Sequence, residues 1–212
     1  MDERGSDADR REARDLDRLV FFSDAVMAIA ITLLVIDLRL PDLPSGATDA
    51  DLRAVLIELA PRLLAFFLSF AVIGLWWVSH HRFFGSVLRL DSWLVVLDLA
   101  FLGAIAFLPF PTSILGTSVL PTSVALYALT NAVIGYLLVG LRTYADRKAL
   151  IDPVVPLDLY RRRTTRAALA PTVFAASIPI AYVAPIAAAW SWNLVWIGIL
   201  ISRRLFGPVG RY

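Results

Sequence analysis

Two long stretches of the sequence carry no charged residue, and they constrain the fold more than any other feature. Residues 99–141 contain no Asp, Glu, Lys or Arg, and neither do residues 167–202. A chain of 212 residues folded in water has too little interior to bury both. The chain is also 58% hydrophobic, above the roughly 45–50% typical of soluble domains. This predicts an integral membrane protein.

The remaining composition excludes several function classes. The sequence has no cysteine, which excludes disulfides, thiol catalysis and Cys-ligated metals. Its two histidines, His80 and His81, are adjacent and point to different faces of a helix, so they do not form a zinc site together. No nucleophile and base stand out, and the net charge of +2 is too small to indicate nucleic-acid binding. We expect no enzymatic activity, no resident metal or cofactor and no nucleic-acid partner.

The apolar segments predict an all-α, polytopic membrane protein with six transmembrane helices. A helix needs about 20 apolar residues to cross the hydrocarbon layer. The last apolar stretch, residues 167–201, is too long for one crossing and should turn near Pro179 and Pro185. A charged segment, 1–18, precedes the membrane domain, 19–205, and a short tail, 206–212, follows it. The expected spans are residues 20–38, 63–79, 93–115, 120–141, 167–183 and 186–201.

The basic residues predict the orientation. If both termini are cytoplasmic, 17 of the 20 Lys and Arg residues lie on the cytoplasmic side. Only Arg39, Arg53 and Arg62 then lie outside, which agrees with the positive-inside rule. The outer loop between the first two spans is acidic, and we expect a short helix from about Asp49, capped by Thr48 or Asp49.

Asp24 is the most informative charge because it lies inside the first apolar helix. An ionisable group there is costly and is usually paired or faces a cavity. Its candidate partners are Arg18, Ser23, and His80 or His81 at the same expected depth in the second span. Three interpretations are open: a polar network between helices, a cap at the helix start, and a proton relay.

The first span also has a regular apolar stripe. On a helical wheel of about 100° per residue, Ile29, Leu33 and Ile36 fall within about 60° of one another, with Thr32 beside them. Asp24 falls about 140° from Ile29 on the same wheel. If several copies of this helix surrounded an axis, the stripe would form rings that narrow and dewet a pore. The alternative is that the stripe faces lipid or neighbouring helices.

The first three spans resemble the transmembrane protein 175 family. Arg18, three further residues and then Phe22-Ser23-Asp24 match the signature of the family's first helix. The run from Trp76 and Trp77 through His80, His81 and Arg82 to Phe83 resembles the end of its second helix, and residues 107–112 resemble the end of its third. The last three spans match only in number and length.

The resemblance implies a potassium channel of four chains around one pore lined by the first helix. Ile29, Leu33 and Ile36 would form the constricting rings, and Thr32 would contribute to selectivity. Arg18, Ser23 and Asp24 would hold the pore helix against the second and third helices. The expected function is a leak-like channel with modest potassium selectivity in the bacterial plasma membrane. Its expected partners are three further copies, potassium and other monovalent cations, and membrane lipids.

Asp98 departs from the resemblance, which leads us to expect an asparagine-like residue in the third span. This extra carboxylate could pair with His80, His81 or Arg18, or make gating depend on pH. An alternative function is a proton-coupled secondary transporter that uses Asp24 and Asp98, and a scaffold role is the least specific interpretation. The Phe-Ser-Asp motif occurs once, so one chain cannot enclose a pore.

Overall fold

The chain begins with one long helix in the computed structural model, which describes residues 3–43 and 45–198. Helix α1 spans Glu3–Leu33 and continues as a tighter 3₁₀ turn, η1, over Leu34–Asp37. The charged segment is therefore helical and continuous with the first span. Its Glu, Ala and Arg residues are good helix formers, and no proline interrupts them.

A short helix, α2 (Asp49–Glu58), follows the first outer loop, as expected. Thr48 is its cap. The Thr48 hydroxyl accepts a hydrogen bond from the Asp51 backbone N–H (3.4 Å), and the Asp51 carboxylate accepts one from the Thr48 N–H (2.7 Å). This reciprocal pair satisfies backbone groups that the helix start leaves free.

Prolines divide the later helices. Helix α3 spans Ala60–Phe84, and the expected third span forms two helices, α4 (Ser92–Phe107) and α5 (Pro109–Thr117), separated at Leu108. The break precedes Pro109, whose ring disfavours helical continuity at the residue before it. Helix α6 (Pro121–Arg147) is followed by α7 (Leu157–Ala167), α8 (Leu169–Ala181) and α9 (Pro185–Ser191). The chain thus turns between α8 and α9 inside the predicted 179–185 region.

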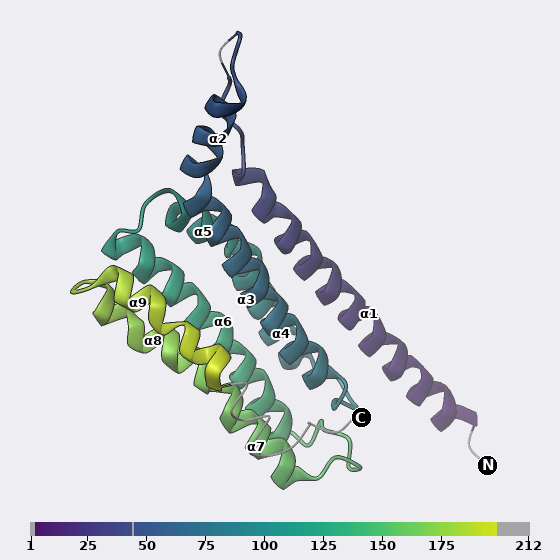
Figure 1. Ribbon diagram of the computed structural model, residues 1–212. Coiled ribbons are helices and arrows are strands. Elements are labelled where there is room, and N and C mark those ends of the chain that lie inside the picture. Colours follow the sequence, from purple (N-terminus) through teal and green to yellow (C-terminus); the bar gives the residue numbers. More distant parts are fainter. Residues whose placement is uncertain (1–2, 44, 199–212) are drawn as a thin grey trace.

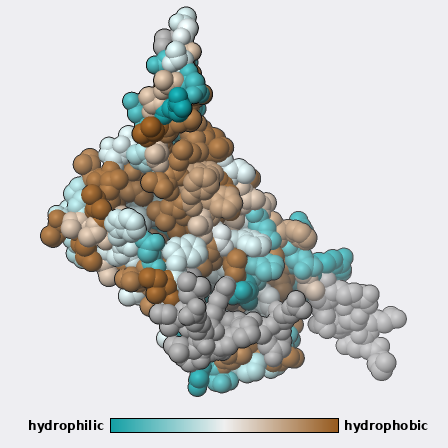
Figure 2. Space-filling model, viewed as in Figure 1, coloured by the Kyte–Doolittle hydropathy of each residue, from teal (hydrophilic) through white to brown (hydrophobic). Residues whose placement is uncertain are grey.

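The helices form a bundle with α1 at one edge (Figure 1). Helix α1 packs against α3 and α4, whereas α6 packs against α4 on one side and α8 on the other. Helix α2 projects from the end of the bundle opposite to α7 and to the beginning of α1. Figure 2 shows a hydrophobic band across the middle of this face, with hydrophilic residues near α2 and on the part of α1 next to the grey residues.

Four of the described helical segments are long and apolar enough to cross a membrane: Arg11–Asp37, Ala60–Phe84, Ser92–Thr117 and Pro121–Arg147. The protein is therefore an all-α, multi-pass membrane protein. Helices α8 and α9 are individually shorter, and their role as a fifth and a sixth span stays a prediction. The end of the expected sixth span and the 206–212 tail lie outside the described residues.

The core lies where α6 meets α3 and α8. A side chain at Gly135 would place its first carbon 2.6 Å from the Pro171 ring and 2.7 Å from the Trp76 ring, so the close approach of the three helices requires glycine here. Trp76 also donates a hydrogen bond from its indole to Asn131 (3.1 Å). This contact and Gly135 fix α3, the partner of α1, against the rest of the bundle.

Candidate functional site

Helix α1 has one buried and one exposed apolar face. Met27, Ala30 and Leu34 are at most 2% exposed and pack into the bundle. Ile29 and Ile36, in contrast, are 57% and 50% exposed in the single chain. A long apolar side chain left exposed within the membrane region faces either lipid or another protein chain.

Thr32 and Leu33 extend the exposed face between Ile29 and Ile36. Both are exposed, and the Thr32 hydroxyl donates a hydrogen bond to the Ile29 carbonyl (2.8 Å). Because its hydrogen is used within the helix, the Thr32 oxygen presents lone pairs outward. Ile36 lies in η1, where the wheel assumed a regular α-helix, but its exposure places it on the open side with the other three.

A buried polar anchor ties α1 to α4 and α3. The Ser23 hydroxyl lies 2.8 Å from Asp98 Oδ2 and donates to it, with the Leu19 carbonyl, also at 2.8 Å, as its alternative acceptor. His80 Nε2 lies 2.7 Å from the other carboxylate oxygen, Oδ1. Ser23, His80 and Asp98 are all completely buried. Three helices therefore meet at one carboxylate.

Aromatic rings enclose this anchor. The His80 ring stacks on Phe101, with ring centres 5.1 Å apart and planes within 8°, and it also packs against Phe84. Its second nitrogen, Nδ1, is buried without a hydrogen-bond partner in the described part of the chain. Asp98 thus receives donors on both oxygens while the far side of the histidine is apolar.

Asp24 makes a second link between α1 and α3. Its Oδ1 accepts a hydrogen bond from the Trp77 indole (2.8 Å), and the Trp77 ring stacks on His81 at 5.5 Å. Asp24 is half-buried and lies away from the exposed stripe. The side chain that binds it, Trp77, was not among the four partners that the sequence suggested.

The structure separates the remaining sequence candidates. The interpretation of Ser23 and Asp24 as a helix cap is wrong, because α1 begins at Glu3. Asp98 binds His80 and Ser23, whereas His81 is exposed. Arg18 and Phe22 are exposed, and no hydrogen bond or ion pair joins Arg18 to the described residues. The expected contact of Arg18 with the second and third spans is therefore not found in the single chain.

A further polar cluster was not predicted. The Ser69 hydroxyl lies 2.8 Å from the Thr112 hydroxyl and 3.1 Å from that of Tyr127, joining α3, α5 and α6. All three residues are buried. The signal was weak in the sequence, because single hydroxyl residues in apolar spans also satisfy themselves by bonding the preceding turn, as Thr112 does with the Leu108 carbonyl.

Comparison with known proteins identifies the family. A protein named potassium channel from Streptomyces collinus is 34% identical over 174 residues, which cover 78% of this chain and 82% of the relative. A family model described as endosomal/lysosomal potassium channel TMEM175 matches residues 18–109. The chain belongs to the TMEM175 family.

The TMEM175 match includes every residue of the exposed stripe and of the polar anchor, and it ends at the first residue of α5. The human protein named endosomal/lysosomal proton channel TMEM175 is 39% identical over 106 residues, covering 46% of this chain but 21% of the human chain. The likeness to the human protein thus covers less than half of this chain.

The fold agrees with a solved TMEM175 structure over nearly its whole length. The crystal structure of a lysosomal potassium-selective channel TMEM175 homolog from Chamaesiphon minutus superposes with a TM-score of 0.77 at 26% identity. The match covers 89% of this chain and 98% of that one. Helices α6–α9, which the TMEM175 family model does not include, therefore belong to the same fold.

Proposed function

We propose that this protein forms a potassium channel whose pore is lined by the exposed face of α1. The observation that carries the proposal is the pairing of an exposed stripe, Ile29, Thr32, Leu33 and Ile36, with an opposite face that is buried and hydrogen-bonded. Two bacterial relatives are named potassium channels, which supports potassium as the permeant ion.

The pore requires several copies, because one chain presents one stripe. Four copies is the number implied by the resemblance, and four α1 helices would bring Ile29, Leu33 and Ile36 into three successive rings. Apolar constrictions of this kind gate by excluding water. Potassium sheds hydration water more readily than sodium, so a tight apolar ring favours it, and the outward Thr32 oxygens offer the ion polar contacts. Selectivity is expected to be modest.

We infer a bacterial plasma membrane with both termini cytoplasmic. The basic helix α7 and the beginning of α1 lie at the end of the bundle opposite to α2. Under the positive-inside rule the basic end is cytoplasmic. This orientation places the acidic α2 loop outside, at the outer mouth of the proposed pore.

The first test is cation flux into liposomes that contain the purified full chain, with potassium, sodium or caesium gradients and protein-free controls. We expect potassium uptake to exceed sodium uptake and to persist without a proton gradient. Ile29→Asn should raise flux and reduce selectivity, because it hydrates one ring. The matched control is Ile180→Asn, at another exposed isoleucine on α8, which should leave flux unchanged. Equal effects of both variants on cation flux would show that Ile29 does not line the pore.

A proton-coupled transporter is a second candidate. The observation that favours it is the fully buried Asp98–His80 pair, which holds an exchangeable proton within the membrane region. Asp24 and Asp98 both lie on the side of α1 away from the stripe. Uptake that requires a proton gradient and is lost in Asp98→Asn would favour this function over the channel.

A further inference from the structure

Arg142 of α6 lies near the end of the bundle where α7 packs on α6, and it is only 7% exposed. One of its terminal nitrogens donates to the Ser79 carbonyl (2.7 Å) and lies 3.1 Å from the Ser79 hydroxyl. The guanidinium also lies over the Phe83 ring at 5.9 Å.

Among the described residues, the positive charges of two further arginines act on Arg142, namely Arg82 at the end of α3 and Arg163 of α7, and the three form an arginine cluster. Buried Nε atoms of both Arg142 and Arg163 have no hydrogen-bond partner within the described residues. Arg82 is exposed and Arg163 partly exposed, so the cluster opens to the surface. A buried charge without a counter-ion is costly.

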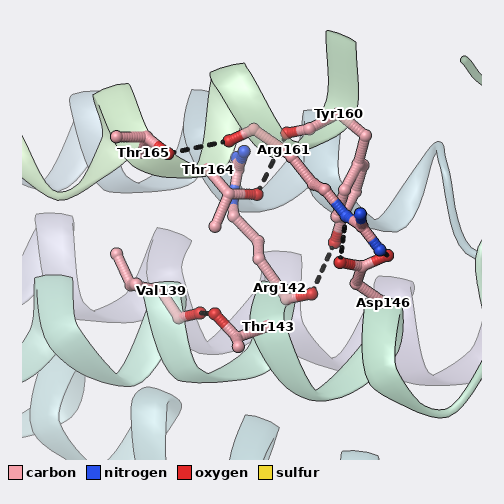
Figure 3. A network of polar contacts seen from close by, with 8 residues as sticks. All are labelled: Val139, Arg142, Thr143, Asp146, Tyr160, Arg161, Thr164 and Thr165. Carbon is pink, nitrogen blue, oxygen red and sulfur yellow. Dashed lines mark hydrogen bonds and ion pairs between the residues drawn. The ribbon is translucent and has the colours of Figure 1, made fainter. Parts of the chain in front are cut away.

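The nearby groups in the described part of the chain do not neutralise this cluster. Figure 3 shows the contact between α6 and α7. Here Arg161 Nε donates a hydrogen bond to the Asp146 carboxylate (2.8 Å), so the negative charge of Asp146 is already paired. The buried Tyr160 hydroxyl donates to the Arg142 carbonyl (2.9 Å). Burial raises the pKa of Tyr160 well above its usual range, so the phenol stays uncharged and supplies no negative charge.

We propose that Arg82, Arg142 and Arg163 form a binding site for a phosphate group. Guanidinium groups bind phosphate oxygens through paired N–H donors, and a phosphate offers acceptors to several arginines at once. The cluster lies at the basic end of the candidate membrane-spanning helices, where lipid headgroups are expected. The phosphate of an anionic phospholipid and dissolved phosphate share this chemistry, and the lipid is the source that the position favours.

The test measures binding to the purified full chain in detergent, independently of ion flux. Native mass spectrometry compares phosphatidic acid with diacylglycerol, which lacks the phosphate, and a thermal-shift titration uses inorganic phosphate and glycerol 3-phosphate. Losing one charged hydrogen-bond donor should weaken binding about tenfold in Arg163→Gln and in Arg82→Gln. The matched control is Arg162→Gln, which removes the same charge from an exposed neighbour on α7.

Phosphatidic acid binding that falls in the two cluster variants, with less than a twofold change in the control, supports a lipid phosphate site. The same pattern with the soluble phosphates alone supports a site for dissolved phosphate. Equal losses in all three variants would reduce the effect to diffuse surface charge and overturn the proposal. The proposal would also be overturned if the wild-type chain bound phosphatidic acid no better than diacylglycerol and bound neither soluble anion.

Discussion

Two candidate membrane spans of the same length, the first span (Arg11–Asp37) and α6 (Pro121–Arg147), relate to the bundle in opposite ways. The most apolar 18-residue window of the first span is 22% buried, whereas that of α6 is 61% buried, although the first span is the more apolar. Helix α6 is enclosed by α4, α8 and α3, and α1 is held along one side by α3 and α4. The most hydrophobic of the four candidate spans is thus the one that is least buried within its own chain. This indicates that its exposed surface contacts lipid or other copies of the chain.

The largest expected effect on stability comes from removing the carboxylate that ties α1 to its neighbours. Asp98→Ala leaves His80 buried without its partner and leaves the Ser23 hydroxyl only the Leu19 carbonyl within its own helix. Breaking a buried pair costs about 3–5 kcal/mol. We expect the thermal unfolding midpoint in detergent, followed by tryptophan fluorescence, to fall by roughly 10 °C. Asp98→Asn keeps one oxygen acceptor, so its unfolding midpoint should fall less than that of Asp98→Ala. If both variants unfold like the wild type, the anchor does not hold α1.

The next prediction compares two consecutive leucines on opposite faces of the first span. Leu34 is 2% exposed, so Leu34→Ala leaves a cavity and should cost about 2 kcal/mol. Leu33 is 40% exposed, so Leu33→Ala should change stability by less than about 0.5 kcal/mol while raising ion conductance and reducing selectivity. Thermal unfolding and liposome flux on both variants measure the contrast. A Leu33→Ala chain that is strongly destabilised but conducts normally would reverse the assignment of faces.

A third prediction tests the enclosed helix with two glycines of α6. Gly135→Ala forces a methyl group against Pro171 and Trp76 and should cost about 2 kcal/mol. Gly140→Ala meets nothing within 4 Å, and should be neutral or stabilising by up to about 1 kcal/mol through helix propensity. Both are read from unfolding midpoints. Similar midpoints for the two variants would mean that α6 is packed more loosely than the structure indicates.

The smallest expected effect on stability concerns the second link of α1. Asp24→Ala removes the hydrogen bond from the Trp77 indole, worth about 1 kcal/mol. We expect it to weaken assembly of the chains, measured by size-exclusion chromatography with light scattering, more than permeation. Trp77→Phe removes the donor of the same hydrogen bond and serves as the matched variant. A normal assembly with altered proton dependence of flux would instead favour a relay role for Asp24.

The sequence predicted which residues form the anchor better than how they pair. Asp24 and Asp98 were singled out because carboxylates in apolar spans need partners, and His80 was one of three candidates for Asp98. The partner of Asp24 depends on how α3 is rotated about its axis, which turns Trp77 toward α1 and His80 toward α4. The same rotation turns Trp76 toward Asn131 and Gly135 of α6, which lie far from the second-span motif in sequence.

Near the start of the chain, the number of helices was easier to predict than their boundaries. Apolar content locates the part of α1 in the membrane, but its beginning at Glu3 depends on helix propensity in a charged segment. The break at Leu108 follows from Pro109, a local signal that a count of apolar residues does not register. Ile36 is still exposed after the change to a 3₁₀ turn, as is Val35 beside it, whereas Leu34 in the same turn is buried.

The continuity of α1 makes it a lever. Its 31 residues form a rod about 46 Å long, pinned near Ser23, about 30 Å from the Glu3 end and about 15 Å from Leu33. The longer arm is steadied by an exposed ion pair between Glu12 and Arg89, 3.9 Å apart. If α1 tilts as a rigid rod about this point, its two ends move in opposite directions, and the Glu3 end travels about twice as far as Leu33.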